Sequence, residues 1–466
     1  MKSNSEFKIL TAGYGLHVIN ILWEPIKRRS NFSFCHLLHP SYFRNDILEE
    51  QNYLNLYCVR EKPNLILPYP NIEFLSGLET DGVPTIHNMI MGDSFLCSIP
   101  YSEALAYASF VGLQMEKLFL ELKPSLIVSG FDGFHSSMSL AIAKKIKIPW
   151  FALSFSVLPK GLTGFSTTTD NSKTFSALEI SKSNLKILAE KTLSDFETYI
   201  LEAPTIKTEN NIKSIIEKVP NRVSNLLISV KNYLNFKHDK YTRRSISQSF
   251  LDYFRRKVNL IFLQGRTMLM NPPNTPFMFI GLHMQPEMAI DVWAPFFSNQ
   301  FNVIESIARS APPSHKLLVK VHKIDADNYS LFQFNRLKNF PNVEIVSPYA
   351  SSRLFIEKAA LVFSIQGTIT LEAAMLGKQV LVFGETLYND FSNVTKVGRI
   401  TDLPSQIRSK LLENTLDRDS ILAGLESVLS RFAPGCYNDW NQSPTDFNLK
   451  SLVKHFEALR SYIEDR

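Results

Sequence analysis

The amino-acid sequence predicts an α/β protein with two parallel-sheet units, a mainly helical segment between them and further helices at the C-terminus. In two separate parts of the chain, short apolar runs alternate with stretches of helical periodicity. Residues 171–260 lie between these parts and show helical character without a strand rhythm. The length of 466 residues, with 45% hydrophobic and 20% charged residues, agrees with several globular domains.

The first unit is expected in residues 1–170. An apolar run that ends in Gly13-Tyr14-Gly15 predicts a first strand followed by a tight turn. Later apolar residues alternate at spacings of three and four, which predicts a long helix that ends before Pro124. The expected elements are strands at 7–12, 125–129 and 150–155 and helices at 102–122 and 136–146.

The second unit is expected in residues 271–440, after a helical basic insertion at 171–270 and before a C-terminal helix at 441–466. The segment from Lys207 to Lys257 contains twelve Lys/Arg and four Asp/Glu, a local net charge of +8. The order of elements in the second unit is typical of a Rossmann-like domain. The expected strands are 277–281, 316–321, 343–346, 361–365 and 379–383, with helices near 299–310, 351–359 and 369–376.

Composition narrows the class of protein. The N-terminus lacks the apolar run of a secretory signal, and no stretch approaches the ~20 apolar residues of a membrane span. The four cysteines have no CxxC spacing, which favours reduced thiols over disulfides or a zinc site. The net charge of +6 is too weak to indicate nucleic acid by itself. We therefore expect a cytoplasmic protein, or one peripheral at the inner membrane through the basic segment 207–257.

The strongest motif spans residues 361–384, SIQGTITLEAAMLGKQVLVFG preceded by Leu-Val-Phe. A buried strand leads into Gln366, Gly367 and Thr368, and a helix follows at once. Free N–H groups at a helix start favour an anion, and Glu372, one turn later, can accept two ribose hydroxyls. The alternative is an ordinary helix with a threonine cap and a favourable acidic residue. The complete pattern favours a nucleotide site.

Two further motifs also follow predicted strands. Lys320 and His322 come at the end of the strand 316–321, where two donors can hold a phosphate or a leaving nucleotide. His283, Gln285 and Glu287 follow the strand 277–281 and can position a sugar or transfer a proton. The alternatives are a solvated strand edge for the first motif and a polar turn before a helix for the second.

In the first unit, Asp132 and His135 follow the strand 125–129 and are expected on the acceptor side together with Gly13 and Gly15. Asp132 is a candidate base or nucleophile, with a turn residue as the equal alternative. Gly13 and Gly15 alone do not make a dinucleotide fingerprint, and the common ATPase, metalloprotease and hydrolase motifs are absent. Asp325-Ala-Asp327 matches a metal-binding DxD pattern weakly, and we expect it to be solvated.

The three motifs LHMQPE, VKVH and SIQGTITLEAAMLGKQVLVFG resemble, in order and spacing, the capsule polysaccharide synthesis family, which includes transferases of β-linked Kdo from CMP-Kdo. The resemblance covers residues 275–400 well. It implies a GT-B fold of two Rossmann-like domains facing a cleft, with the donor nucleotide in the C-terminal one and no obligatory metal. It also implies donor contacts at Gln285, Lys320, His322, Gln366, Gly367, Thr368 and Glu372. Lys323 replaces the proline that usually follows the family's histidine.

The predicted function is therefore metal-independent transfer of Kdo or a related sugar from a CMP-sugar to a lipid-linked or glycan acceptor in surface polysaccharide synthesis. His283, Glu287 and Asp132 are the catalytic candidates, and no cofactor, metal or nucleic-acid partner is expected. A CDP-polyol phosphotransferase, a non-catalytic assembly scaffold and a sugar-nucleotide epimerase remain as alternatives, because fold alone does not separate them.

Overall fold

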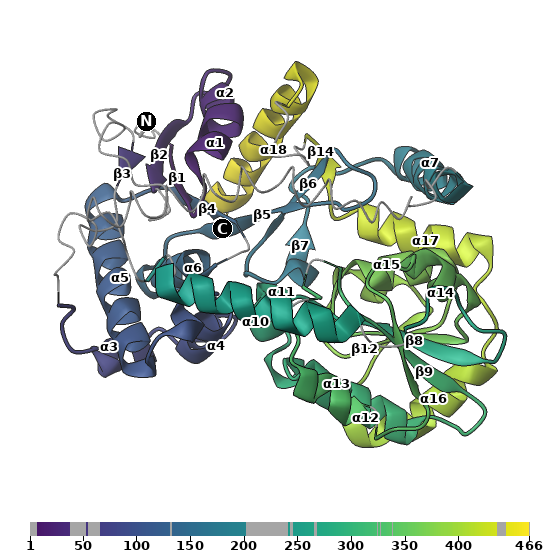
Figure 1. Ribbon diagram of the computed structural model, residues 1–466. Coiled ribbons are helices and arrows are strands. Elements are labelled where there is room, and N and C mark those ends of the chain that lie inside the picture. Colours follow the sequence, from purple (N-terminus) through teal and green to yellow (C-terminus); the bar gives the residue numbers. More distant parts are fainter. Residues whose placement is uncertain are drawn as a thin grey trace, which may run out of the picture.

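The computed structural model describes residues 7–37, 53–54, 66–130, 133–201, 241–242, 246–264, 268–323, 325–326, 328–337, 339–435 and 444–465. Within them the chain forms two sheets, each with helices on both faces (Figure 1). The first sheet has the strand order β14-β6-β5-β4-β1-β2-β3, with β7 paired to β6. The second has the order β10-β9-β8-β11-β12-β13. The expected fold class, α/β and GT-B-like, is confirmed.

The first unit has a parallel centre and an antiparallel edge. β1 to β5 pair in parallel in the order 3-2-1-4-5, and β6, β7 and β14 add antiparallel pairs. Its strands are β1 (Lys8–Ala12), β2 (Ser33–Leu37), β3 (Tyr53–Leu54), β4 (Leu126–Ser129), β5 (Trp150–Phe155), β6 (Leu162–Ser166), β7 (Thr174–Phe175) and β14 (Ala433–Pro434). Its helices are α1 (Leu16–Val18), the π-helix η1 (Ile19–Trp23), α2 (Glu24–Lys27), α3 (Ile72–Ser76), α4 (Ile86–Met91), η4 (Leu96–Ser98), α5 (Tyr101–Leu122), α6 (Phe134–Ile146) and η5 (Asn171–Lys173).

All described strands of the second unit are parallel, and their order 3-2-1-4-5-6 is that of a dinucleotide-binding Rossmann sheet. The strands are β8 (Phe277–Gly281), β9 (Lys316–Lys320), β10 (Val343–Val346), β11 (Leu361–Ser364), β12 (Val380–Val382) and β13 (Val394–Lys396). The helices are α11 (Met288–Asp291), η6 (Pro295–Phe297), α12 (Gln300–Ser310), α13 (Leu331–Leu337), α14 (Ser352–Lys358), α15 (Thr368–Met375), η7 (Leu387–Asp390), η8 (Ile400–Asp402), α16 (Leu403–Leu412) and α17 (Arg418–Leu429). Most of these strands are buried on both faces, which explains their continuous apolar runs.

Two segments cross between the units. Ala189 and Leu193 of α7 (Lys182–Leu201) belong to the core of the second sheet, beside α17. After α17 the chain returns: β14 pairs with β6, and Leu452 and Phe456 of α18 (Asp446–Glu464) pack under the first sheet. The boundary expected at residue 440 therefore falls after a strand that joins the first sheet. Likewise β7 belongs to the first sheet, so the helical segment does not start at 171.

Candidate functional site

The three sequence motifs follow three strands that are neighbours in the second sheet. β8 lies between β9 and β11, and all three run in parallel. The segments 282–287, 321–323 and 365–368 therefore leave the sheet at the same, carboxyl edge. The strand order reverses between β8 and β11, and such a switch point is where open α/β sheets bind ligands. The motifs converge as the sequence predicts.

The ring of His283 lies against the start of α15. Gly367 is the N-cap of this helix, with φ +102° and ψ −171°, and no side chain caps the helix. A Cβ atom at Gly367 would lie 3.1 Å from Cε1 of His283. Glycine is therefore favoured at this position for two reasons: the backbone conformation is one that other residues avoid, and the imidazole comes close to the Cα atom. Because the N-cap is a glycine, it has no side chain that competes with an anion for the N–H groups of the first turn, of which that of Thr370 bonds to the carbonyl of Gly367 at 3.2 Å.

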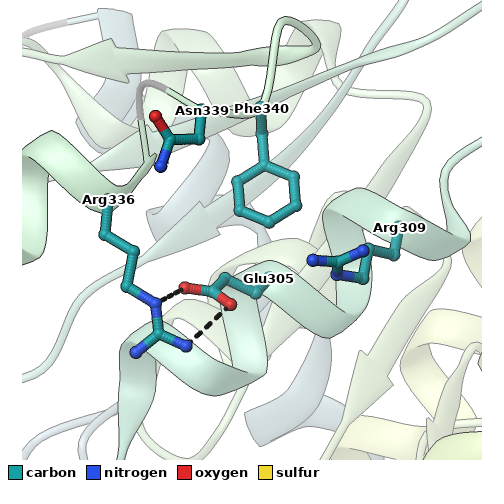
Figure 2. Close-up of a pocket in the computed structure, with 5 residues that line it drawn as sticks. All are labelled: Glu305, Arg309, Arg336, Asn339 and Phe340. Atoms are coloured by element: carbon teal, nitrogen blue, oxygen red, sulfur yellow. Dashed lines mark hydrogen bonds and ion pairs between the residues drawn. The ribbon is translucent and has the colours of Figure 1, made fainter.

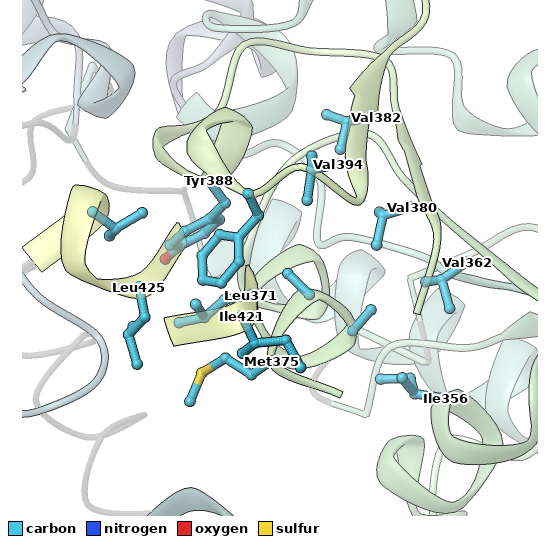
Figure 3. Close-up of a cluster of buried hydrophobic side chains, with 14 of the residues drawn as sticks. Ile356, Val362, Leu371, Met375, Val380, Val382, Tyr388, Val394, Ile421 and Leu425 are labelled. Carbon is cyan, nitrogen blue, oxygen red and sulfur yellow. The ribbon is translucent and has the colours of Figure 1, made fainter. Parts of the chain in front are cut away.

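Apolar packing holds α15 on the sheet beneath. Leu371 and Met375 on the buried face of α15 belong to one core with Val362 and Val380 of the strands (Figure 3). A rigid helix keeps Gly367 at a fixed position relative to the strand ends. Glu372 lies on the same helix but is only half-buried, as expected for a residue near the rim of the site.

The loop after β8 is held by a network of buried polar groups. Gln285 donates its amide to Asp291 Oδ1 at 2.9 Å and to the carbonyl of Ser298 at 2.7 Å, and its Oε1 accepts from Gln300 at 2.9 Å. Gln300 also accepts from the backbone N–H of His283 at 2.7 Å. Gln285 therefore positions this loop through protein contacts. Its predicted contact with a nucleotide stays a prediction.

The loop after β9 braces the same segment. Asp325 Oδ2 accepts from the N–H of Gln285 at 3.1 Å, Asn328 donates to the carbonyl of Gln285 at 2.7 Å, and Tyr329 donates to the carbonyl of His283 at 2.5 Å. Asp325 is only 7% exposed. The expectation that it is solvated was wrong, because it satisfies a backbone N–H of the neighbouring loop. Asp327 lies outside the described residues.

Several buried polar atoms at this edge lack a protein partner among the described residues. They are Nε2 of His283, Nδ1 of His322 and Nη1 of Arg353. Nearby, the Lys320 side chain is 8% exposed, and its Nζ lies 3.4 Å from the carbonyl of Pro348. An unsatisfied buried polar group costs about 1–3 kcal/mol. A ligand that supplies acceptors here would remove that cost.

Burial and mutual charge shift the titration of this cluster. Burial lowers the pKa of Lys320, which Glu372 partly restores, and burial raises the pKa of Glu372, against the charges of Arg353 and Lys320. Burial, with His322 nearby, lowers the pKa of His283 to about 4. Burial and Lys320 also lower the pKa of His322. These couplings show that the side chains from the three motifs share one environment, with His283 neutral at pH 7.

Arg353 belongs to this cluster, and sequence reasoning missed it. It lies in the first turn of α14, its guanidinium stacks 4.3 Å from the ring centroid of Phe196, and its Nε donates to Glu357 at 2.7 Å. Its position in the sequence could have indicated this, because Arg353 follows β10, the strand beside β9, and the loop after β10 leaves the same edge of the sheet.

The remaining motif residues lie at different depths. Thr368 is exposed at the first turn of α15, and Glu287 is the N-cap of α11, with its N–H bonded to Asp291 at 2.9 Å. Gln366 is 1% exposed and donates to the carbonyl of Glu385, so its side chain is directed into the protein. Lys323 is exposed. The roles predicted for these residues remain predictions.

The acceptor-side residues of the first unit have different surroundings. Gly13 follows β1 with φ +81°, and Gly15 accepts the N–H of Ile19 at the start of η1, so both lie at the carboxyl edge of the first sheet. His135 is buried, with its Nε2 3.0 Å from the hydroxyl of Tyr107. His135 lies in the first turn of α6 and is packed against Tyr107 of α5, so it is not exposed as an acceptor-side contact would be. Asp132 lies outside the described residues.

One surface hollow lies elsewhere in the second unit. It is lined by Glu305, Arg309, Arg336, Asn339 and Phe340 (Figure 2). Arg336 pairs with Glu305 there, and the guanidinium of Arg309 lies 5.1 Å from the ring centroid of Phe340. Arg309 and Phe340 lie in the segments that lead into β9 and β10, towards the amino edge of the sheet. The hollow is thus separate from the motif residues.

Comparison with known families agrees with the motif analysis. Residues 192–405 match the model of the capsule polysaccharide biosynthesis proteins. This segment is therefore similar to the proteins of that family. It covers just under half of the chain and contains all three motifs, so the resemblance inferred from them is confirmed.

The individual proteins that the chain resembles are distant from it in sequence. Protein FixF of Sinorhizobium fredii is 24% identical over 115 residues, which are 24% of this chain and 27% of that protein. The chain thus matches about a quarter of the length of that relative. Solved structures similar to the chain include a β-Kdo 2,4-transferase, KpsC of Thermosulfurimonas dismutans, at 13% identity (67% of this chain, 85% of that chain, TM-score 0.32). Another is UDP-GlcNAc 2-epimerase of Methanocaldococcus jannaschii, at 13% identity (90% and 96%, TM-score 0.31).

Proposed function

We propose that the chain is a glycosyltransferase of capsule-like surface polysaccharide synthesis, which transfers Kdo or a related sugar from a CMP-sugar to a lipid-linked or glycan acceptor. The observation that carries the proposal is a set of cationic and imidazole groups at the switch point of the second sheet, several of whose buried nitrogen atoms have no hydrogen-bond partner among the described residues. They lie within the segment that matches the capsule polysaccharide family. The identity of the sugar rests on the resemblance of the motifs.

The charge of the site supports a donor with one phosphate. Lys320, Arg353 and the start of α15 can each donate to phosphate oxygens. Glu372 balances part of the positive charge, and its carboxylate can accept the two ribose hydroxyls. The local excess of positive charge is therefore small. A diphosphate would need a further cation or a metal, and Lys323, whose charge also lowers the pKa of Lys320, is a cation that could serve a second phosphate.

The chemistry requires a proton acceptor for the attacking hydroxyl and stabilisation of the departing CMP phosphate. Lys320, His322 and Arg353 are placed to stabilise the phosphate as it leaves. His283 is neutral at pH 7 with an unmatched Nε2, so it can accept a hydrogen bond or a proton at the switch point. Glu287 and Asp132 remain the other candidates for the base or nucleophile. If Asp132→Asn keeps near-normal turnover, the role passes to Glu287 or His283.

The proposal includes no metal and no cofactor. Among the described residues, no three His, Cys, Asp or Glu side chains form a group that could hold a metal ion. Asp325, from the weak DxD match, is already engaged with Gln285 and Asn328. Nucleotide binding in EDTA tests this part of the proposal directly.

Thermal stabilisation by nucleotides provides the test. A ligand at 100 times its Kd stabilises the folded state by ~2.7 kcal/mol, a readily measured rise in Tm. We expect CMP to raise Tm in EDTA, and UDP and GDP to have no effect. A larger response to UDP, or a response that needs Mg²⁺ or Mn²⁺, would overturn the donor assignment.

Product analysis separates the alternative activities. The chain is incubated with a glycan acceptor and either CMP-Kdo or a CDP-polyol, and the masses of the products are measured by mass spectrometry. We expect an acceptor heavier by one sugar. An acceptor heavier by a polyol phosphate would identify a phosphotransferase, and nucleotide binding without any product from a panel of donors would favour a scaffold.

A further inference from the structure

Helix α10 (Ile246–Gln264) carries an exposed apolar face. The side chains of Phe250, Phe254 and Ile261 are 61%, 60% and 67% exposed, and Leu251 and Val258 beside them are also exposed. Residues spaced by four, four and three positions lie on one side of a helix, so Phe250, Phe254, Val258 and Ile261 form a single stripe. Exposed aromatic side chains grouped in this way mark an interaction surface.

The flanks and the opposite side of α10 are polar and basic. Lys257 lies beside the stripe with its Nζ 5.6 Å from the ring centroid of Tyr253, and Arg255 lies on the other flank. Asn259, on the opposite side, is buried. The helix is therefore amphipathic, with its apolar side away from the protein and its basic residues at the border. Proteins that lie in the membrane interface have helices of this kind.

Two contacts place α10 beside the candidate donor site. Arg255 donates to Asn328 Oδ1 at 2.9 Å, and Asn328 in turn donates to the carbonyl of Gln285. Just before the helix, the ring of Tyr241 stacks on Tyr107 of the first unit at 4.6 Å between centroids. Figure 1 shows α10 running from the first unit to the second. A surface that receives a lipid-linked acceptor would need to lie near this position.

We propose that the stripe formed by Phe250, Leu251, Phe254, Val258 and Ile261 docks α10 in the plane of an anionic bilayer. Apolar residues bordered by Lys257 and Arg255 match the acyl chains and the anionic headgroups of such a surface. The one acidic residue in this part of the helix, Asp252, pairs with Arg255. Among the described residues no helix is long and apolar enough to cross a membrane. This surface begins in the basic segment 207–257 and continues past it to Ile261; residues 207–240 and 243–245 of that segment lie outside the described structure.

Vesicle flotation tests the docking surface with the full chain. Vesicles of phosphatidylcholine with phosphatidylglycerol are compared with phosphatidylcholine alone, at low and high NaCl. We expect binding to the anionic vesicles that falls as salt rises. The triple substitution Phe250→Ser, Phe254→Ser, Ile261→Ser should weaken binding by about tenfold or more, and Lys257→Glu by about fivefold. Both variants leave the Arg255–Asn328 contact in place.

A matched triple substitution controls for the general loss of surface hydrophobicity. Leu120, Ile187 and Phe447 are 53%, 63% and 70% exposed on α5, α7 and α18, and serine at all three should leave vesicle binding unchanged. The proposal is overturned if the two triple variants bind anionic vesicles equally. It is also overturned if the α10 variant changes only the sedimentation of the protein without vesicles, because a second copy of the chain then covers the stripe. CMP stabilisation of the α10 variant shows that it is folded and tests the proposed function separately.

Discussion

In the first unit, a protein carboxylate bonds the start of α6 at its junction with β4, because Asp93 accepts from the backbone N–H of Phe134, whereas cationic and imidazole groups lie near the start of α15, at its junction with β11, in the second unit. Both junctions follow the fourth strand of a 3-2-1-4-5 order. Both helices begin after a glycine with positive φ, Gly133 at +91° and Gly367 at +102°, so neither N-cap residue has a side chain that could cap its helix. The backbone conformation at the start of the helix is therefore similar in the two units.

The side chains around the two junctions differ. In the first unit Ser129 donates to the carbonyl of Ala12 at 3.1 Å, and Tyr107 bonds with His135. In the second, Lys320 and Arg353 face Glu372. The carboxylate of Asp93 thus already bonds the start of α6, whereas the side chains near the start of α15 include two cations, Lys320 and Arg353. The junction between β11 and α15 is therefore the one where we propose that the donor phosphate binds.

Replacing the two glycines is expected to have the largest effect. It also separates the loss of stability that comes from the backbone conformation from the loss of CMP binding. Gly133→Ala and Gly367→Ala should each lower the free energy of unfolding by about 1–3 kcal/mol, because alanine avoids these conformations. Only Gly367→Ala also pushes a Cβ towards His283. We expect it to weaken CMP binding by about tenfold or more, measured by calorimetry, while Gly133→Ala binds CMP normally. An equal loss of CMP affinity in both variants would mean that CMP binding does not distinguish the two junctions.

Removing the acidic member of the charged cluster should have the next largest effect. Glu372→Ala loses a charged hydrogen bond to the ribose, which corresponds to about 1.5–3 kcal/mol of CMP binding energy. Glu116→Ala is the control in the first unit, because that carboxylate pairs with Lys145 at 2.9 Å away from the second sheet. Calorimetric titration with CMP measures both. Retention of full affinity by Glu372→Ala would move the ribose contact to another residue.

Sequence reasoning predicted β8 to β12 of the second unit, but not β13, and it predicted the meeting of the motifs, because these depend on local signals. Continuous apolar runs identified β8, β9 and β11, and parallel strands place whatever follows them at one edge. Arg353 was missed because no motif surrounded it. Its link to Glu372 comes from the adjacency of β10 and β9, which depends on strand order.

The return of the C-terminal segment to the first sheet could not be predicted either. Periodicity in α18 shows that Leu452 and Phe456 are buried, but it does not show against which unit. The same limit applies to Gln285 and Asp325. A polar residue in a loop can bind a ligand or another loop, and only the folded chain shows that these two bind each other's segment.

The smallest expected effect concerns acid stability and compares buried histidines in the two units. Burial lowers the folded-state pKa of His283 in the second unit, and of His36 and His455 in the first, to about 4. The unfolded chain, with a histidine pKa of about 6.5, binds more protons between these values. The free energy of unfolding should therefore fall as pH drops from about 6.5 towards about 4. His283→Gln removes one such group, so its loss of stability between pH 7 and pH 5 should be smaller than that of the parent by about 1–2 kcal/mol.

Urea unfolding at several pH values measures this difference, with His87→Gln on an exposed position as the control. Adding CMP gives a second comparison between the buried histidines of the two units. A phosphate bound beside His283 favours the protonated imidazole, so saturating CMP should lessen the contribution of His283 to acid destabilisation while leaving those of His36 and His455 unchanged. The same pH profile for His283→Gln and the parent, with and without CMP, would show that His283 is not buried beside the donor phosphate.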